Sequence, residues 1–439
     1  MFSFSARSLG TLTGRRITQW QRRFLSTDIL DAEEPLRRYR HGGYHPVHIG
    51  DTLEQRRYTI VRKLGWGAYS TVWLARDAVL NRHVALKILT DEASSGPARL
   101  PEVALLQRIK QPGLEHPGSY HLAHMLHNFR FVGPNGRHVC LTFDILGDSV
   151  ASLQQRCTNE MIPTSLLQTV SREVLLALDC LHRNCGIIHT DIKPHNILLH
   201  LYDPESAIHH ALTNDPARCH ELNSRSPRLP RYLVESQPIP SDYDPRSFET
   251  PFRVKLADLG TGRWVGEPPD GDEVQAPPVR APEVITGAPY GTGIDIWGLA
   301  CVLYYLWSGQ WLFSPSAFEH LGMTRDDDHL YQIMTTLGEF PQHLMSALSF
   351  AQRGQPGPLG MGAPPYAVTT LAATVRSVAP AGTSALERAD FADFLGMMLR
   401  IDPSARASAN ALLKHRWLAT RYPRDALTVV PDVRTAVYF

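Results

Sequence analysis

One stretch, residues 187–199, constrains this chain more than any other. Its sequence is IIHTDIKPHNILL, with apolar residues at both ends and polar residues between them. The apolar ends can be buried as short strands, so the polar middle, residues 189–196, is left as a loop held at both ends. The pattern therefore predicts a firmly anchored loop that presents several charged and amide side chains.

Three side chains of this loop, Asp191, Lys193 and Asn196, are spaced so that they can face one small volume. An Asp can orient an attacking hydroxyl and accept its proton, a Lys can neutralise a moving phosphoryl group, and an Asn can hold a metal ion. A lone Asp-x-Lys is most often a solvated turn, but the apolar flanks and the Asn in register favour phosphoryl transfer. Asp191 and Lys193 are therefore the candidate catalytic residues, and Asn196 is a candidate metal ligand.

Composition narrows the class of protein. With 439 residues, 43% hydrophobic and 20% charged, the chain has ordinary globular composition and is long enough for two packed lobes. The net charge of +1 gives no overall field that would attract nucleic acid or an acidic membrane, so we expect no direct nucleic-acid partner. The six cysteines include no Cys-x-x-Cys pair, which suits reduced thiols inside a cell and predicts no structural metal.

The N-terminal segment, residues 1–57, is expected to lie outside the folded core. Residues 1–27 contain five arginines, many Ser and Thr, and no acid. This composition is typical of a mitochondrial transit peptide and equally of a disordered basic tail, so import into mitochondria is one of two open interpretations. Residues 31–44 are polar and rich in Arg, Gly and Tyr, which predicts a linker or strap lying over the folded domain.

A glycine-rich hairpin is predicted at residues 58–75, where two β-rich runs are joined by a turn containing Gly65 and Gly67. Glycines there let backbone amides approach a polyphosphate, and the hairpin can close over it. Ser70 stands where a third glycine would complete a dinucleotide fingerprint, so that fingerprint is not matched.

A lysine, Lys87, lies near the end of the next predicted strand, residues 83–89. In a sheet covered by the glycine hairpin, its ammonium would reach nucleotide phosphates rather than extend along an edge into water. The ammonium needs an anion to fix it, and Glu102 on the following helical pattern is the candidate. Pro101 must either open that helix or kink it.

Two further strands complete the predicted cleft. Residues 138–143 form an apolar strand that ends in a flexible joint, Asp144 to Gly147, where backbone groups could bind an adenine with Phe143 behind it. A strand that begins near residue 252 ends at Asp258, followed by Leu and Gly. Because this strand follows the catalytic strand, we expect the Asp258 carboxylate where a metal bridging nucleotide phosphates would sit.

The rest of the chain gives two loop predictions. Residues 200–251 are rich in Pro, Ser, Arg and His, with little periodicity, and predict a mostly disordered insert. Residues 350–384 are rich in Gly, Pro and Ala and also predict loop. Helices are expected to resume at residues 388–399 and 407–417.

Two carboxylates in the second half are expected to be buried and paired. Asp295 lies in the longest apolar run, residues 294–313, which polar residues interrupt, so we expect a buried helix rather than a membrane span. A buried carboxylate needs a partner. Asp295 can bond the backbone of the catalytic loop, and Glu283 can pair with Arg406.

Taken together, these motifs resemble the eukaryotic protein kinases over residues 58–418. Several are more narrowly similar to the SR-protein kinases, which phosphorylate serines in Arg/Ser-rich splicing factors. These are Leu64-Gly65-Trp66-Gly67, Ser70-Thr71-Val72-Trp73-Leu74, Ile188-His189-Thr190-Asp191-Ile192-Lys193-Pro194, Asp258-Leu259-Gly260 and Arg325-Asp326-Asp327-Asp328-His329. The resemblance implies an α+β bilobal protein-kinase fold, with a β-rich N-lobe at 58–146, a mainly helical C-lobe at 147–418 and a tail at 419–439.

The resemblance also implies the site residues and partners. ATP and Mg2+ would lie between the lobes, with Asn196 and Asp258 on the metal. The implied nucleotide-binding residues are Leu64, Gly65, Gly67, Val72, Ala85, Lys87, Glu102, Phe143, Asp144 and Leu146. The substrate would be a protein, with Arg/Ser-rich proteins as the candidate class, and the location the cytoplasm and nucleus. We expect a monomer without a transmembrane segment.

Three departures from the family pattern carry their own expectations. Thr190 stands where many kinases have an Arg that binds a phosphate, and residues 262–279 contain no Ser, Thr or Tyr, so we expect activity without phosphorylation of that loop. Ala276 replaces a Thr whose hydroxyl would bridge the catalytic Asp and Lys, which predicts slower turnover. The family's acidic docking surface is only partly represented, by Asp326, Asp327, Asp328 and Glu339.

Two other functions remain open from the sequence. Small-molecule phosphotransferases also use His-x-Asp followed by Asn, although residues 280–283 with Asp295 and Arg406 favour a platform for protein substrates. The second is a pseudokinase, a nucleotide-binding scaffold without turnover. Ala276 and Pro101 support it, whereas retention of the catalytic residues opposes it.

Overall fold

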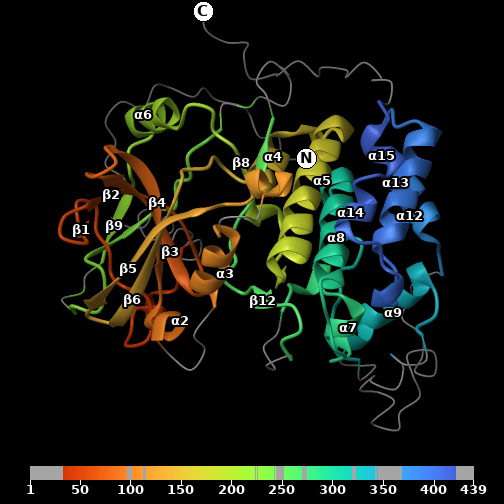
Figure 1. Ribbon diagram of the computed structural model, residues 1–439, viewed down its shortest axis with the longest axis horizontal. Coiled ribbons are helices and arrows are strands. Elements are labelled where there is room, and N and C mark those ends of the chain that lie inside the picture. The colour runs from red at the N-terminus through yellow and green to blue at the C-terminus, as the bar shows by residue number, and fades with distance from the viewer. Residues whose placement is uncertain are drawn as a thin grey trace, which may run out of the picture.

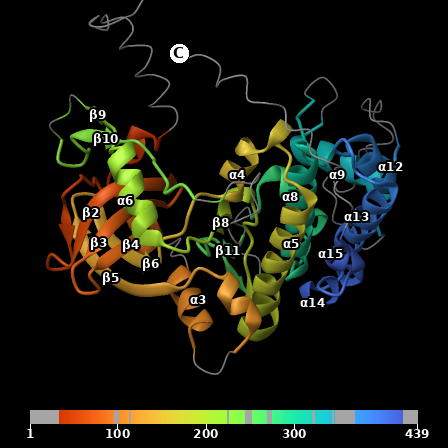
Figure 2. The same ribbon diagram turned by 90° about the horizontal axis from the view of Figure 1, so that it is seen from above.

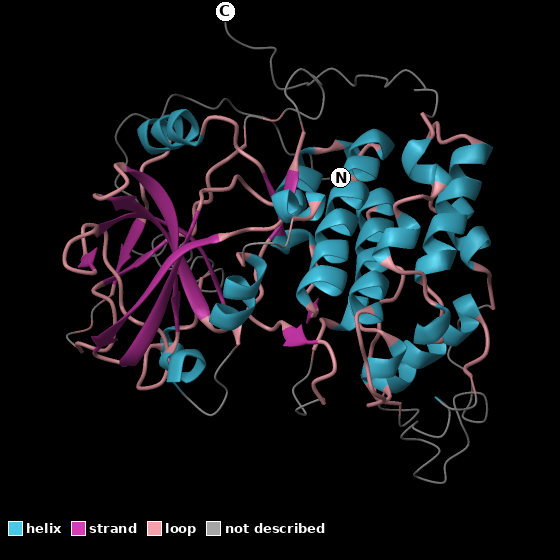
Figure 3. Cartoon of the chain, in the orientation of Figure 1, coloured by secondary structure: helices cyan, strands magenta, loops and turns pink. Residues whose placement is uncertain are grey.

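The computed structural model describes residues 33–95, 101–111, 115–222, 224, 226–241, 243, 252–268, 274–318, 323–341, 344 and 368–421. A lobe built on a β-sheet lies beside a lobe of packed helices, and the two kinds of secondary structure separate clearly (Figures 1 and 3). The predicted α+β architecture is therefore present. The segment interpreted as a transit peptide or basic tail, and the tail beyond residue 421, lie outside the described residues.

The first lobe is organised around a six-stranded antiparallel sheet in the order β1-β2-β3-β4-β6-β5. Its strands are β1 (Thr52–Leu53), β2 (Tyr58–Gly67), β3 (Ser70–Asp77), β4 (Arg82–Leu89), β5 (Met125–Gly133) and β6 (Gly136–Phe143). Two short helices, α2 (Asp91–Ser95) and α3 (Glu102–Ile109), follow β4. Strand residues rich in aromatic and β-branched side chains bury one face of this sheet, with Trp73 and Ile60 in its core.

The predicted glycine-rich turn lies two residues further along the chain than expected. Gly65 and Gly67 are the last part of strand β2 and pair with Val72 and Ser70, so the turn itself is made by residues 68 and 69. Irregular pairing between Lys63 and Gly65 accompanies this extension. The glycines thus belong to an extended backbone, which keeps their amides in line along the hairpin.

The second lobe is helical. Its α-helices are α4 (Val150–Arg156), α5 (Thr164–Asp179), α7 (Pro282–Ile285), α8 (Gly293–Ser308), α9 (Arg325–Leu337), α12 (Leu371–Ser377), α13 (Ala385–Met398), α14 (Ala409–Leu412) and α15 (Arg416–Ala419). A π-helix, Cys180–Cys185, continues α5. Along the described chain as a whole, short 3-10 helices occur at Leu36–Arg38 in the strap and at Pro117–His121, Thr158–Glu160, Pro194–Asn196, Pro277–Val279 and Pro403–Ala405. Two small antiparallel pairs join β7 (Ile187–Ile188) to β12 (Arg263–Trp264), and β8 (Ile197–Leu199) to β11 (Val254–Leu256).

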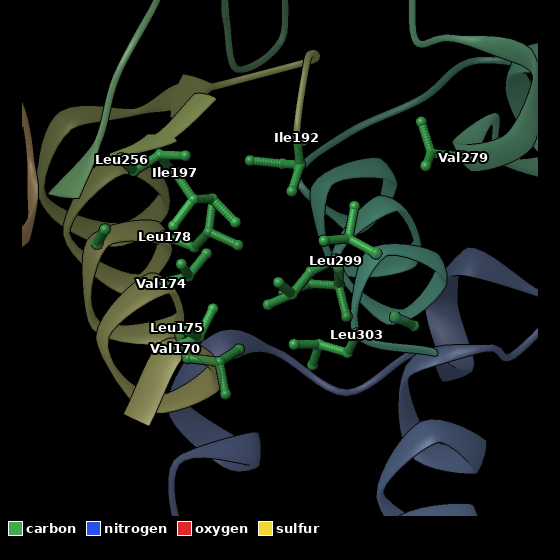
Figure 4. Close-up of a cluster of buried hydrophobic side chains, with 14 of the residues drawn as sticks. Val170, Val174, Leu175, Leu178, Ile192, Ile197, Leu256, Val279, Leu299 and Leu303 are labelled. Atoms are coloured by element: carbon green, nitrogen blue, oxygen red, sulfur yellow. The ribbon is translucent and has the colours of Figure 1, made fainter. Parts of the chain in front are cut away.

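The core of this lobe lies between α5 and α8. Leucine and valine side chains from the two helices face one another, with Val174 and Leu178 opposite Leu299 and Leu303 (Figure 4). Ile192 from the loop between β7 and β8 belongs to the same cluster, so the helical core also supports the polar loop. Helix α8 is buried along nearly all of its length, as predicted. Within the described ranges, none of the helices combines the length and apolar character that crossing a membrane requires.

The insert is largely ordered where it is described, contrary to the expectation of a mostly disordered excursion. It forms helix α6 (Pro204–Asn214) and a hairpin of β9 (Cys219–Glu221) and β10 (Tyr232–Val234). Both lie beside the β-sheet lobe (Figure 2). Helix α6 buries only Ala207, Ile208 and Ala211. This apolar face is small and gives a weak periodic signal, but it is enough to pack against Leu74 and Ile145.

A second helix was also missed. Helix α12 (Leu371–Ser377) lies in the stretch predicted as loop, and it buries only Val375. A helix this short with one buried residue shows almost no apolar periodicity. The remainder of that stretch, residues 350–367, is outside the described residues.

The predicted strap does lie over the sheet, and its attachment is a buried cluster of charges. Lys63 of β2 is fully buried, and its ammonium donates to Glu33 Oε2 at 2.7 Å, to Glu34, and to the Val234 carbonyl at 3.2 Å. The phenol of Tyr39 also donates to Glu34. One lysine therefore joins the strap, the sheet and the insert hairpin.

The predicted pair of Glu283 and Arg406 is present and completely buried. Arg406 donates from Nη1 to Glu283 Oε1 at 2.7 Å and from Nη2 to Oε2 at 3.1 Å. We expect Arg406→Met to lower the free energy of unfolding by about 3 to 5 kcal/mol, because it leaves the Glu283 carboxylate buried without a counter-charge. Chemical denaturation monitored by circular dichroism measures this.

The matched control is Arg218→Met. Arg218 pairs with Asp215 and Glu235, but its side chain is 52% exposed. Its removal should change the unfolding free energy little, since water screens surface ion pairs. Equal losses in the two variants would contradict the importance given to burial.

Candidate active site

The polar loop is anchored by the two short strand pairs and by one buried carboxylate. Asp295 of α8 accepts hydrogen bonds from His189 N and Thr190 N, both at 2.8 Å, and its Oδ2 lies 2.9 Å from His182 Nε2. Thr190 has a φ of +69°, a strained value for a threonine. The predicted contact between Asp295 and the loop backbone is therefore present, and it offsets the strain at Thr190.

The three predicted residues of this loop converge. Asp191 Oδ2 accepts from Lys193 Nζ at 2.6 Å and from Asn196 Nδ2 at 3.0 Å. Asn196 Nδ2 also donates to the Asp191 carbonyl at 2.9 Å, which ties both ends of the loop together. The Asp191 and Lys193 side chains remain 20% and 37% exposed, so both can be reached from the cleft.

A second group of charges faces the loop from the sheet. Lys87 Nζ lies 2.6 Å from Glu102 Oε1 and 2.8 Å from Asp258 Oδ1. Glu102 is the first residue of α3 and Pro101 precedes it as the N-cap, so the proline opens the helix and does not kink it. The predicted pairing of Lys87 with Glu102 is thereby present.

The electrostatics of this group favour the charged forms of Lys87 and Asp258. Burial alone would lower the pKa of Lys87, but the carboxylates of Asp258 and Glu102 outweigh it and raise that pKa. Desolvation would raise the pKa of Asp258, yet the Lys87 ammonium dominates and holds it well below its usual range. Lysine and aspartate thus remain an ammonium and a carboxylate over the whole physiological pH range.

Asp258 reaches the site because β11 pairs with β8. Ala257 N donates to the Asn196 carbonyl at 2.9 Å, so Asp258 and Asn196 leave neighbouring points of one small sheet. Asp258 has a φ of +71°, and its Oδ1 accepts from Gly260 N at 3.1 Å. A carboxylate and an amide, whose oxygens are the ligands that Mg2+ and similar hard cations prefer, are brought together in this way.

The predicted nucleotide-binding residues of the sheet are brought together by strand register. Val72 of β3 pairs with Gly65 on one side and with Lys87 on the other. Ala85 of β4 pairs with Phe143 of β6. These residues therefore occupy adjacent positions across four neighbouring strands, next to the Lys87 ammonium.

The backbone of the hairpin is uncovered at both glycines. A Cβ added at Gly65 or Gly67 would meet no atom within 4 Å, so both glycines border open space. Leu64, the residue before them, is half-buried. A side chain at either glycine would fill part of the space that a phosphate group needs.

The joint after β6, predicted to be flexible, is held by contacts at both of its ends. Asp144 is exposed and pairs with Arg82 at 2.9 Å. Leu146 is half-buried, and the next amide, Gly147 N, donates to the Leu199 carbonyl at 2.8 Å. The joint is therefore fixed to the strand that follows the catalytic loop.

Comparison with known proteins agrees with this geometry. A family model described as the protein kinase domain matches residues 58–210 and 243–418. The chain is 34% identical over 409 residues to the serine/threonine-protein kinase SRPK of Physarum polycephalum, covering 90% of this chain and 93% of the relative. It is 30% identical over 393 residues to the protein kinase dsk1 of Schizosaccharomyces pombe, covering 71% of each. It is 27% identical over 538 residues to SRSF protein kinase 3 of Mus musculus, covering 90% and 92%.

This chain belongs to the protein kinase family. It is a serine/threonine protein kinase of the SR-protein-kinase-like group, which confirms the resemblance drawn from its motifs. The kinase therefore has the bilobal fold and uses ATP, typically with a divalent metal ion, to phosphorylate protein substrates. The stretch that the family model leaves out, residues 211–242, falls within the insert.

The acidic cluster near α9 of the kinase is used mainly within the fold. Asp327 forms a capping box with Thr324, and Asp328 is buried and accepts from Ser316 N at 2.8 Å. Asp326 is exposed, 3.6 Å from Arg280, and Glu339 is also exposed. Of the four acids expected on a docking surface, two therefore face solvent.

One residue of the site region was not anticipated. Gln275 is buried with a φ of +64°, and its side chain donates to the Ile294 carbonyl at 2.9 Å and accepts from Ala281 N at 2.9 Å. It holds the segment before Arg280 against α8. A lone glutamine in a Gly/Pro-rich loop gives no sequence signal, since its role depends wholly on tertiary contacts.

We expect Asp295→Asn to lower kcat of the kinase about a hundredfold, because an amide cannot accept both backbone N–H groups and the Asp191 loop shifts. Asp328→Asn is the control, since Asp328 is equally buried and accepts a backbone N–H away from the cleft. Steady-state kinetics beside unfolding curves separate the two effects. If both variants lost stability and Asp295→Asn had the same kcat as Asp328→Asn, a positioning role for Asp295 would be contradicted.

Proposed function

We propose that the kinase transfers the γ-phosphoryl group of ATP, bound with Mg2+, to serines in Arg/Ser-rich proteins. The observation that carries this is the proximity of two charged groups. Asp191 lies with Lys193 and Asn196 in one loop, and Asp258 pairs with Lys87 and also feels the charge of Lys193. The relatives named SRPK and SRSF protein kinase 3 support the substrate class. The assignment of individual roles follows from the chemistry of each side chain.

Asp191 is the proposed catalytic base. Its Oδ2 is fixed by Lys193 and Asn196, which leaves the carboxylate oriented to accept a proton from a serine hydroxyl. The Lys193 ammonium, 2.6 Å from that oxygen, is placed to neutralise charge on the phosphoryl group as it moves. Ala276 offers no hydroxyl to bridge these two side chains, and turnover slower than in relatives with a threonine remains our expectation.

Asn196 and Asp258 are the proposed metal ligands. Asn196 donates through its amide nitrogen, so its amide oxygen is the group that can bind a cation. The Asp258 carboxylate is 42% exposed toward the cleft and stays charged beside Lys87. When bound, Mg2+ would neutralise phosphate charge and help orient the reacting groups.

The nucleotide phosphates are proposed to lie between Lys87 and the β2–β3 hairpin. The ammonium is held by Glu102, and the amides of Gly65 and Gly67 can approach an anion without a side chain between. Val72, Ala85 and Leu64 would border the sugar and base, and the joint from Phe143 to Leu146 would bind the adenine edge.

Other features of the kinase remain proposals. We retain a division into an N-lobe at 58–146 and a C-lobe at 147–418, with a monomer as the working state. We propose the cytoplasm and nucleus as its location; the comparisons lend no support to mitochondrial import. The intact charge groups argue against a pseudokinase, and the relatives argue against a small-molecule phosphotransferase.

Transfer of labelled phosphate from ATP tests the proposal. An Arg-Ser repeat peptide should be phosphorylated well, a generic basic protein less, and an aminoglycoside not at all. Asp191→Asn should lower kcat about 10²- to 10⁴-fold, the usual contribution of a general base, whereas Asp393→Asn, on the distant helix α13, should leave it unchanged. Unchanged transfer by Asp191→Asn would remove the role given to that carboxylate, and nucleotide binding without transfer would favour a scaffold.

The activity should not depend on phosphorylation of the loop that begins at Thr261. Thr190 Oγ1 donates to the Thr261 carbonyl at 2.9 Å, so a hydroxyl occupies the position where many kinases hold a phosphate with an arginine. Residues 262–279 contain no Ser, Thr or Tyr. Purified kinase treated with a phosphatase that is then removed should keep its kcat. A loss of activity restored by incubation with ATP would contradict this.

A further inference from the structure

The strap reaches the tip of the glycine hairpin. Tyr44 donates its phenolic hydrogen to the Gly67 carbonyl at 2.8 Å and lies 3.3 Å from the Ala68 carbonyl. Arg38 Nη2 donates to the Ala68 carbonyl at 2.7 Å. Thr90 N, at the end of β4, donates to the Tyr69 carbonyl at 2.8 Å. Three consecutive carbonyls at the turn are therefore held from outside the hairpin.

The strap is itself rigid at this point. Tyr44 is 2% exposed, and its amide donates to the Arg38 carbonyl at 3.1 Å, which closes a tight loop between the two residues. A Cβ at Gly43 would lie 1.8 Å from the Arg38 carbonyl oxygen, so only glycine fits inside that loop. The Arg38 guanidinium also lies over the Tyr44 ring, 5.5 Å from its centroid. The two donors thus approach the turn as one unit.

Three further contacts fix the strap to the lobe. Arg38 and Arg40 both pair with Glu92 of α2, at 3.7 and 2.8 Å. Asn135 Nδ2 donates to the Tyr44 carbonyl at 2.6 Å. Because these anchors lie in α2 and the β5–β6 turn, the position of Tyr44 is set by parts of the lobe other than the hairpin.

A hairpin tip without such contacts would have to be ordered when a ligand binds beneath it. Fixing the residues of such a tip costs backbone entropy, and a site that is ordered beforehand avoids that cost. The tip here is already bonded at each of its carbonyls from 67 to 69. The space bordered by Gly65 and Gly67 is consequently preformed.

We propose that Tyr44 and Arg38 are positioning residues for ATP, which hold the hairpin tip in the conformation that the phosphates require. This rests on the proposed function, in that the phosphates are placed under the hairpin. Neither residue touches the catalytic loop, so their effect falls on nucleotide affinity and not on the chemical step. The strap is thereby part of the nucleotide site although it precedes the N-lobe in the chain.

Tyr39 provides a matched comparison on the same strap. It is 5% exposed and its hydroxyl also makes a buried hydrogen bond, but to Glu34 and not to the turn. Tyr39→Phe and Tyr44→Phe therefore each remove one buried phenolic hydrogen bond from the strap. Only Tyr44→Phe releases the Gly67 carbonyl.

The experiment measures KM for ATP and kcat in the full-length kinase and in both variants, with an Arg-Ser peptide as substrate. Tyr44→Phe should raise KM for ATP about threefold to tenfold, as expected for the loss of one hydrogen bond, with kcat unchanged. Tyr39→Phe should leave KM as it is. Equal KM values in the two variants, or a fall in kcat alone in Tyr44→Phe, would overturn the proposal.

A second pair of variants covers the case in which Tyr44→Phe does not fold. Arg38→Gln removes the donor to the Ala68 carbonyl and an ion pair to Glu92, whereas Arg40→Gln removes an ion pair to the same Glu92 and a hydrogen bond to the His41 carbonyl, neither of which involves the turn. KM for ATP should rise for the first and not for the second, and equal values would overturn the proposal. Binding of a fluorescent ATP analogue to the unaltered kinase distinguishes a failure of the proposed function from a failure of the positioning role. Absent binding would refute the proposed function, and intact binding without a variant effect would refute the positioning role alone.

Discussion

The ammonium of Lys87 is the interaction on which the rest of the cleft depends. It lies between Glu102 from a helix of the sheet lobe and Asp258 from the far side of the cleft. A buried lysine without counter-charges would lose its proton, and a buried carboxylate without a cation would gain one. Lys87 and Asp258 therefore keep each other charged, whereas burial raises the pKa of Glu102, and the contacts of Lys87 with both carboxyl groups hold a strand, a helix and a loop in a fixed relation. The proposed nucleotide site is built around that relation.

A second constraint acts from the helical lobe. Asp295 is buried in a long apolar helix, where a carboxylate is costly unless its oxygens accept hydrogen bonds. The catalytic loop supplies these donors from its backbone and in return is kept in a strained conformation at Thr190. The apolar packing of α5 on α8 fixes the carboxylate, so the hydrophobic core sets the position of Asp191 through the hydrogen bonds of Asp295 and through Ile192.

Those parts of the site that obey a local rule could be predicted from the sequence. Apolar pairs around a polar loop gave β7 and β8, and charged residues within apolar runs, such as Asp295 and Glu283, needed partners that the structure supplies. The sequence left open whether Pro101 opens or kinks the helix that carries Glu102, and the structure shows that it opens it. The turn of the hairpin lies two residues beyond its predicted place at Gly65 and Gly67, because pairing with β3 outweighs the turn preference of glycine.

Features that arise only from tertiary contacts could not be predicted. Glu33 and Glu34 lie in a polar segment, and nothing in their neighbourhood indicates that a lysine thirty positions away buries them. Helix α6 shows too narrow an apolar face to stand out from a loop. Both features belong to an outer layer of the sheet lobe. The contacts that hold this layer come from single residues spread along the sequence, so they produce no apolar periodicity.

Helix α6 also bears on how the two lobes move. Its buried face contacts Leu74 in the sheet and Ile145 in the joint between the lobes. If one lobe rotated about that joint, these side chains would have to slide past the helix or lose their packing. The insert is therefore packed against both the sheet and the joint, and any rotation about the joint would have to disturb this packing.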